Sequence, residues 1–172
     1  MATPTTIASA PSEQTTSHQP QQLVVFSMHG EHYALPIVAI REIIRYQRPR
    51  AIGSISSLMQ GVINLRGRVL PVCDLSSELG AMLEISEDSR ILVVDTDGSV
   101  VGLIVDSVDE VLDVTPGQIE DLPVSDTGLG SQIVKIDDRL IILIDTERTF
   151  AGVLNTQSSD DPTLSDEALT AA

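Results

Sequence analysis

The histidines are the first side chains to consider for chemistry, and the sequence has three of them. His18 lies near the beginning, whereas His29 and His32 stand on either side of a Gly-Glu pair. Their spacing differs from that of the two histidines on the helix of a zinc protease. A zinc site at a turn also needs a third ligand and groups that orient the ligands, and the neighbouring sequence supplies neither. We therefore expect no metal site, and a small metal-binding or ligand-binding protein based on His29 and His32 is kept as an alternative.

Carboxylates and glycines offer no catalytic arrangement either. The 25 acidic residues lie in the terminal segments, at turns or beside positions that can cap helices. None forms an isolated pair in the apolar surroundings that raise a pKa for acid catalysis. Gly61 and Gly67 flank residues 62–66, which lack the lysine and the spacing of a phosphate-binding loop. We expect no catalytic residues and no cofactor.

The charge of the chain narrows the class of partner. A net charge of −15 repels nucleic-acid phosphates and anionic lipids, so we expect protein partners, no nucleic acid and no direct membrane insertion. Of the ten basic residues, six fall close together: Arg41, Arg45, Arg48, Arg50, Arg66 and Arg68. The cluster indicates an acidic protein partner, but a solvated surface or a balance of the acidic tails within the molecule would also explain it. Arg66 lies at a tight Leu-Arg-Gly turn, where a guanidinium can fix a loop or bridge to a partner's carboxylate.

Short apolar runs separated by turn residues predict a mainly β protein whose core is built from Val, Ile and Leu. The runs are residues 23–26, 33–35, 61–65, 69–72, 91–94, 100–105, 133–136 and 140–144. Four tight turns with Gly or Asp predict four hairpins, at residues 29–31, 66–67, 97–98 and 137–138. Asp74 and Asp145 each follow an apolar run, and we expect each to cap a short helix.

The two halves of the sequence resemble each other at an offset of about 70 residues. Three segments match in order: residues 24–26 with 93–95, 40–43 with 108–111, and 68–74 with 139–145. The simplest account is a pair of related β subdomains, although any two half-buried strands look alike to some degree.

The ends of the chain predict tails. Residues 1–20 are rich in Thr, Ser, Gln and Pro, and residues 155–172 in Ser, Asp and Ala, so we expect a flexible N-terminal tail and a flexible acidic C-terminal tail. The first 20 residues lack the features of a secretory signal, and the apolar runs are too short to cross a bilayer. Together with a single cysteine, Cys73, this favours a cytoplasmic protein.

Residues 61–75, Gly-Val-Ile-Asn-Leu-Arg-Gly-Arg-Val-Leu-Pro-Val-Cys-Asp-Leu, resemble the signature segment of CheW-like domains. The resemblance extends to residues 101–112, 115–120 and 135–145 and covers roughly 21–154 in all. It implies two five-stranded, SH3-like β-barrel subdomains packed side by side around a shared core, with short helices. We expect subdomain 1 at about 21–85 plus a terminal helix, 146–154, and subdomain 2 at about 86–145.

The resemblance also implies a function. CheW-like proteins are non-enzymatic adaptors that couple methyl-accepting chemoreceptors to a CheA-type histidine kinase, so the implied partners are the receptor's cytoplasmic tip and the kinase's regulatory domain. The implied location is cytoplasmic, at membrane-associated receptor arrays. A scaffold of another chemosensory pathway, for surface motility or second-messenger control, is the alternative. Matched positions place receptor binding at Ile40, Glu42, Ile43, Gly61, Asn64, Arg66 and Val108. Barrel core is an equally good account of Ile40, Ile43 and Val108, and no residues are assigned to the kinase contact.

Overall fold

The structure is a computed structural model that describes residues 20–53, 56–122 and 129–157. The expected tails, 1–20 and 155–172, lie almost entirely outside these ranges. The elements in chain order are β1 (Gln21–Met28), β2 (Glu31–Pro36), the 3-10 helix η1 (Ile37–Ala39), β3 (Ile40–Arg45), β4 (Met59–Leu65), β5 (Arg68–Cys73), β6 (Arg90–Thr96), β7 (Ser99–Val105), β8 (Ser107–Val114), the 3-10 helix η2 (Pro116–Gln118), β9 (Ile119–Asp121), β10 (Gln132–Ile136), β11 (Arg139–Leu143) and α1 (Thr146–Gln157).

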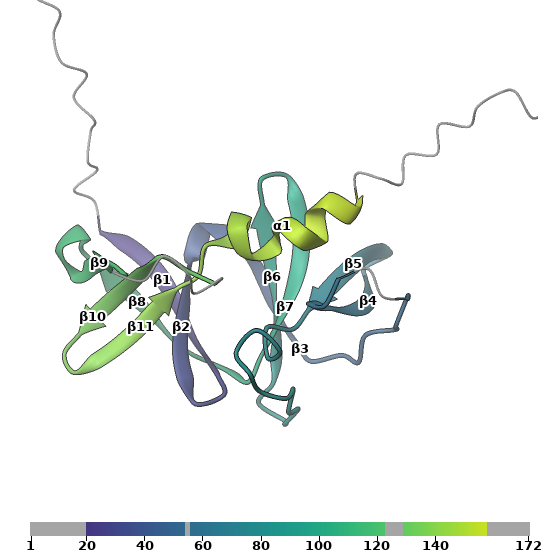
Figure 1. Cartoon of the computed structure of the whole chain (residues 1–172), viewed down its shortest axis with the longest axis horizontal. Helices are drawn as coiled ribbons and strands as arrows, with labels where there is room; N and C mark the ends of the chain where they lie inside the picture. The colour runs from purple at the N-terminus through teal and green to yellow at the C-terminus, as the bar shows by residue number, and fades with distance from the viewer. Residues whose placement is uncertain (1–19, 54–55, 123–128, 158–172) are drawn as a thin grey trace, which may run out of the picture.

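The strands form two sheets that lie side by side, with α1 running across them (Figure 1). Sheet A has the order β8-β1-β2-β11-β10-β9, and sheet B has the order β3-β6-β7-β5-β4. The predicted mainly β fold with two β subdomains is therefore confirmed. Sheet B has the expected five strands, whereas sheet A gains a sixth in the three-residue strand β9.

The two sheets do not follow the two halves of the sequence. Sheet A combines β1 and β2 with β8 to β11, and sheet B holds β3 to β7. The expected division into 21–85 and 86–145 is therefore wrong for the strands. In terms of the sequence repeat, each sheet takes the first hairpin of one half and the later strands of the other half. Local patterns cannot reveal this exchange, because it depends on the pairing of β1 with β8 and of β3 with β6.

All four predicted hairpins are present and join β1 to β2, β4 to β5, β6 to β7 and β10 to β11. In three of the turns both central residues have positive φ, as the tight turns that suit the twist of a hairpin require. These pairs are His29 and Gly30, Arg66 and Gly67, and Asp97 and Gly98. In the fourth turn Asp137 has a φ of 52°. Each of the four turns thus contains a Gly or an Asp with positive φ, as the sequence predicted.

The core has three parts because the central strands are buried on both faces. In β1, Leu23 and Val25 face the interior of sheet A, whereas Phe26 and Met28 face a larger cluster between the sheets. Sheet B has its own interior cluster, which includes Ile91 and Val93 of β6. Residues from β1, β2, β6, β7 and α1 meet in the larger cluster, which confirms the expected shared core.

Of the two aspartates expected to cap a helix, Asp145 does so and Asp74 does not. The Asp145 side chain accepts a hydrogen bond of 3.1 Å from the Arg148 amide at the start of α1, which runs to Gln157 and so extends beyond the expected 154. Asp74 instead accepts hydrogen bonds from the amide and hydroxyl of Ser76, at 2.9 and 2.6 Å, in a single turn. Gly80 ends that turn with a φ of +67°, so the helix predicted after Asp74 is wrong.

Candidate functional site

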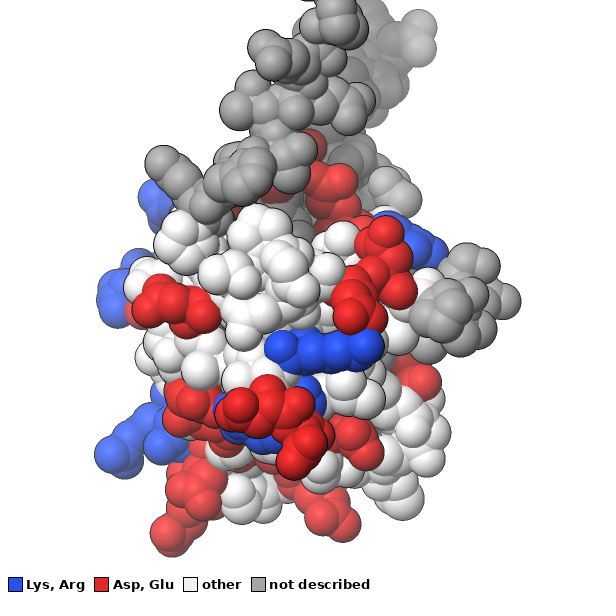
Figure 2. Space-filling view, turned by 90° about the vertical axis from the view of Figure 1, so that its left-hand side faces the viewer, with Lys and Arg blue, Asp and Glu red and all other residues white. Residues whose placement is uncertain are grey.

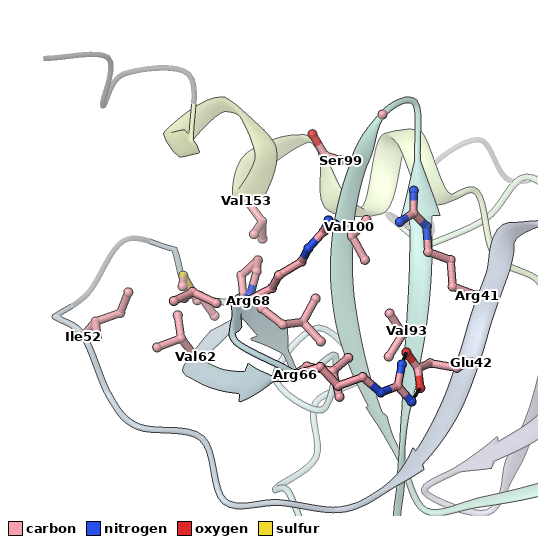
Figure 3. Close-up of a pocket in the computed structure, with 16 residues that line it drawn as sticks. Arg41, Glu42, Ile52, Val62, Arg66, Arg68, Val93, Ser99, Val100 and Val153 are labelled. Carbon is pink, nitrogen blue, oxygen red and sulfur yellow. Dashed lines mark hydrogen bonds and ion pairs between the residues drawn. The ribbon is translucent and has the colours of Figure 1, made fainter.

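Arg66 and Glu42 form a bidentate ion pair that joins the β4–β5 turn to β3. The two guanidinium nitrogens of Arg66 donate to the two carboxylate oxygens of Glu42 at 2.9 and 2.8 Å (Figure 3). The geometry is the parallel fork that makes Arg–carboxylate pairs directional. The side chain of Arg66 is 76% exposed and that of Glu42 is 27% exposed. The pair therefore fixes the position of a guanidinium that solvent, or a partner, can still reach.

This ion pair lies on a groove with a volume of about 730 Å³. The groove is bounded by β3, the β4–β5 hairpin, the β6–β7 hairpin and α1, and its apolar lining includes Val62, Val69, Val100 and Val153. In Figure 3, Arg68 extends from β5 towards Val100, into the space below the helix. An apolar groove with a few fixed charges is typical of a site where a partner is oriented by polar groups and held by apolar contact.

Two further charges border the groove. Arg41, which also lines it, donates from Nε and Nη2 to one oxygen of Asp95, at 2.9 and 2.5 Å. This hydrogen bonding to the Arg41 guanidinium holds the pKa of the Asp95 carboxyl below its usual range. Arg68 differs from Arg41 and Arg66, because no carboxylate among the described residues pairs with it. Arg68 therefore presents the groove's uncompensated charge.

Asn64 and Gly61 shape the hairpin from which Arg66 projects. The side-chain oxygen of Asn64 accepts a hydrogen bond of 2.8 Å from the Gly67 amide, which ties the turn to the end of β4. Arg66 itself has a φ of 51°, a conformation that needs such support in a residue with a side chain. Gly61, at the other end of β4, lies against the backbone of Arg50. Both positions act by holding the hairpin in place.

The three apolar positions predicted for receptor binding lie elsewhere. Ile40 and Val108 are partly buried and pack against the core that the two sheets share. Ile43 is 43% exposed and lies one residue beyond Glu42 on β3, outside the groove lining. The structure thus brings Glu42 and Arg66 together at the groove. Ile40 and Val108 lie outside the groove lining and pack against the core. Sequence reasoning missed Val69, which is 73% exposed, and Val153, because their spacing in the chain gives no sign that they meet.

A family model for the CheW-like domain matches residues 22–153. The chain belongs to this family. The chemotaxis protein CheW of Bacillus subtilis is 34% identical over 144 residues, which are 81% of this chain and 90% of that protein. The probable chemotaxis protein CheW of Rhizobium etli is 36% identical over 137 residues, which are 76% and 88% of the two chains. A crystal structure of the scaffolding protein TtCheW from Thermoanaerobacter tengcongensis superposes with a TM-score of 0.68 and 38% identity, over 73% of this chain and 89% of that one.

The repeat within this CheW-like domain produces a second Arg–Glu pair in sheet A. Glu110 on β8 occupies the place in the repeat that Glu42 has on β3, and it accepts a hydrogen bond of 2.7 Å from Arg139. Arg139 stands at the first position of β11, whereas Arg66 lies within its turn. The two pairs are therefore related but not equivalent, and only the pair in sheet B lines the groove.

The histidines of the CheW-like domain make polar contacts within the molecule. His29 Nε2 lies 2.7 Å from the hydroxyl of Ser76, and His32 Nδ1 lies 3.3 Å from a carboxylate oxygen of Asp109. Among the described residues there is no group of three or more His, Cys, Asp or Glu side chains that could hold a metal ion. Nor does the described part of the chain include a helix long and apolar enough to span a membrane.

Proposed function

We propose that this protein is a non-enzymatic adaptor that couples methyl-accepting chemoreceptors to a CheA-type histidine kinase in a chemosensory array. The observation that carries the proposal is the family match, which spans residues 22–153 and therefore both sheets and the groove between β3 and the β4–β5 hairpin. A relative with the same fold is named a scaffolding protein. An adaptor needs binding surfaces held at a fixed distance, and two sheets joined by one core supply them.

The receptor surface would centre on Glu42 and Arg66, supported by Gly61 and Asn64. Their ion pair holds the guanidinium at the rim of the groove, where its remaining N–H groups can donate to a second carboxylate, supplied by the partner. Apolar contact with the groove would supply affinity, and the two charges would set the orientation of the receptor's cytoplasmic tip. Ile40, Ile43 and Val108 would extend this surface across β3 and towards sheet A.

The second partner would be the regulatory domain of the kinase, and the adaptor would act in the cytoplasm at membrane-associated receptor arrays. Neither role requires catalysis, because both depend on binding geometry. A net charge of −15 fits protein partners better than nucleic acid or anionic lipid. A chemosensory pathway that controls surface motility or a second messenger would use the same surfaces with a different receptor and kinase.

The test is a pull-down from native lysate with the tagged full chain, followed by mass spectrometry. We expect a chemoreceptor and a multidomain histidine kinase to co-purify, and their identities decide the pathway. Arg66→Ala should reduce capture of the receptor, whereas Arg45→Ala, an exposed arginine outside the groove lining, should not. Capture of neither protein would contradict the proposed function. Equal capture by both variants would contradict the role given to Arg66.

A further inference from the structure

The groove lies in a basic region of an acidic protein. Residues 41–73 contain six arginines and a single acidic residue, Glu42, although the whole chain carries a net charge of −15. Three of these arginines line the groove, and two of them are already paired, Arg41 with Asp95 and Arg66 with Glu42. Arg68 projects into the same space without a carboxylate partner in the described part of the chain. The groove is therefore suited to a ligand that brings carboxylates and apolar side chains together.

The opposite end of the molecule has the opposite charge. Figure 2, which looks onto the sheet A end, shows acidic side chains around an area of uncharged residues, with fewer basic side chains between them. The acidic side chains described in residues 107–143 are Asp109, Glu110, Asp113, Glu120, Asp121, Asp137 and Asp138. The two cations there, Lys135 and Arg139, are paired with Glu120 and Glu110. An acidic segment would be repelled from this end and attracted to the groove.

A segment of that composition follows the helix that forms one wall of the groove. Val153 of α1 lines the groove, and α1 ends at Gln157, roughly 6 Å further along a helix that rises 1.5 Å per residue. Residues 158–172 carry four acidic residues, with Leu164 and Leu169 among them: Asp160, Asp161, Asp166 and Glu167. Fifteen residues reach up to about 50 Å when extended, so the segment can span the groove from its attachment point.

We propose that residues 158–172 bind in the arginine-lined groove of their own chain and compete there with the receptor. The carboxylates meet Arg68 and the outer faces of Arg41 and Arg66, and the leucines meet the exposed apolar lining around Val69. The competition with the receptor rests on the proposed function, whereas binding of the segment does not. The segment thus acts as an internal competitor that sets the receptor concentration needed for coupling.

Because residues 158–172 are covalently joined to α1, weak contacts are sufficient to hold them in the groove. A segment joined to α1 is present at its site at an effective concentration in the millimolar range, so each contact need contribute little. The contacts are exposed and electrostatic, and salt should weaken them, since the Debye length falls from about 10 Å at 0.1 M salt to about 3 Å at 1 M. If the segment fills the groove about 80% of the time, the apparent affinity for receptor falls about fivefold.

The first experiment detects the contact without any receptor. A nitroxide is attached to a Thr163→Cys variant of the full chain, and the broadening of backbone amide signals is measured by NMR. Labelling is selective because Cys73 is buried and burial raises the pKa of its thiol to about 12. We expect broadening at Val69 and Ser99 on the groove, and none at Lys135 in sheet A. Absence of broadening at the groove overturns the proposal.

Matched variants show whether charge causes the contact. Neutralising the segment with Asp160→Asn, Asp161→Asn, Asp166→Asn and Glu167→Gln should abolish the broadening. Arg68→Ala should reduce it strongly, and Arg45→Ala should leave it unchanged. Broadening that persists in the neutralised segment, or that is equal in the two arginine variants, overturns the assignment to the arginine-lined groove.

The second experiment measures competition, with a receptor cytoplasmic fragment titrated against the full chain. The neutralised segment should bind the fragment several-fold more tightly than the unmodified chain. A control removes the same number of charges between β5 and β6, with Glu78→Gln, Glu84→Gln, Glu87→Gln and Asp88→Asn, and should not change affinity. Equal affinity of all three chains overturns competition. If none of the three binds the fragment, the proposed function fails, and the amide broadening still decides whether the segment occupies the groove.

Discussion

Gly61 lies so close to the backbone of Arg50 that a Cβ placed on it would stand 2.3 Å from the Arg50 carbonyl oxygen. The next residue, Val62, exchanges two backbone hydrogen bonds with Arg50, at 2.8 and 2.9 Å. These bonds tie the chain that follows β3 to the edge strand β4 and so curl sheet B back on itself. The hairpin that carries Arg66 is held in place at this point.

Gly61→Ala should therefore destabilise the protein by about 2–4 kcal/mol, because it combines a backbone clash with a φ of 148° that side chains rarely adopt. The check is the free energy of unfolding from urea denaturation. Gly117→Ala is the matched control, since a Cβ there meets nothing within 4 Å and no positive φ is involved. Similar stabilities for the two variants would show that the close approach to Arg50 is not needed.

Asp145→Ala should destabilise the protein by about 0.5–2 kcal/mol through loss of the N-cap of α1. Its carboxylate accepts the Arg148 amide, and α1 places Phe150 and Val153 in the shared core. Asp145→Ser should restore most of the loss, because a serine oxygen can accept the same hydrogen bond. Thermal or urea unfolding checks both variants, and equal losses in Ala and Ser would argue against capping.

Stability should fall at alkaline pH because of Cys73. Burial, with a smaller contribution from the Asp74 carboxylate, raises the pKa of its thiol to about 12, whereas a thiol in an unfolded chain titrates near about 8.5. The unfolded state then loses its proton first, so this stabilisation is complete below pH about 8.5 and is lost as the pH rises towards about 12. Burial also raises the pKa of Tyr33, so its hydroxyl should lower the stability further as the pH rises above about 10.

The measurement is the free energy of unfolding at a series of pH values between about 7.5 and 10, where the unfolded thiol titrates. Cys73→Ala should be less stable at neutral pH because it leaves a cavity, but its stability should depend less on pH over this range. Parallel pH profiles for the two chains would mean that the thiol does not titrate differently in the folded and unfolded states.

The sequence predicts the local features of this fold because they have local causes. Turn residues with positive φ mark the hairpins, and apolar runs mark the strands between them. The exchange of hairpins between the two halves of the sequence has no local cause of this kind. It arises when β1 pairs with β8 across 80 to 93 residues, and both repeats offer strands of similar pattern for that pairing. The helix expected after Asp74 fails for a local reason, because Gly80 closes the turn.

The site shows the same limit. Arg66 could be chosen from its place in the Leu-Arg-Gly turn and Glu42 from the resemblance to CheW-like domains, but their pairing across 24 residues follows from the curl of sheet B. The groove itself combines residues from β3, β5, β7 and α1, and no spacing in the sequence brings Val69 and Val153 together. Apolar positions were the hardest to assign, because Ile40 and Val108 have the pattern of core residues and pack as core residues.

Arg66→Ala should reduce receptor capture without a matching loss of stability. The Arg66 side chain is 76% exposed, and exposed ion pairs contribute about 0.2–1 kcal/mol in double-mutant cycles, so the pair with Glu42 should fall in that range. The cycle compares urea unfolding of Arg66→Ala, Glu42→Ala and the double variant. A coupling above about 2 kcal/mol would mean that the pair holds the fold together.

The charge-reversed chain, Arg66→Glu with Glu42→Arg, separates the two roles of the pair. It keeps an ion pair across the same gap, so its stability should return to within about 1 kcal/mol of the unmodified chain. The exposed residue at the groove, position 66, then carries a carboxylate instead of a guanidinium. A carboxylate of the partner, which the guanidinium attracts in the natural chain, is now repelled. Receptor capture should therefore remain low in a well-folded protein, and its recovery would show that the pair serves the hairpin alone.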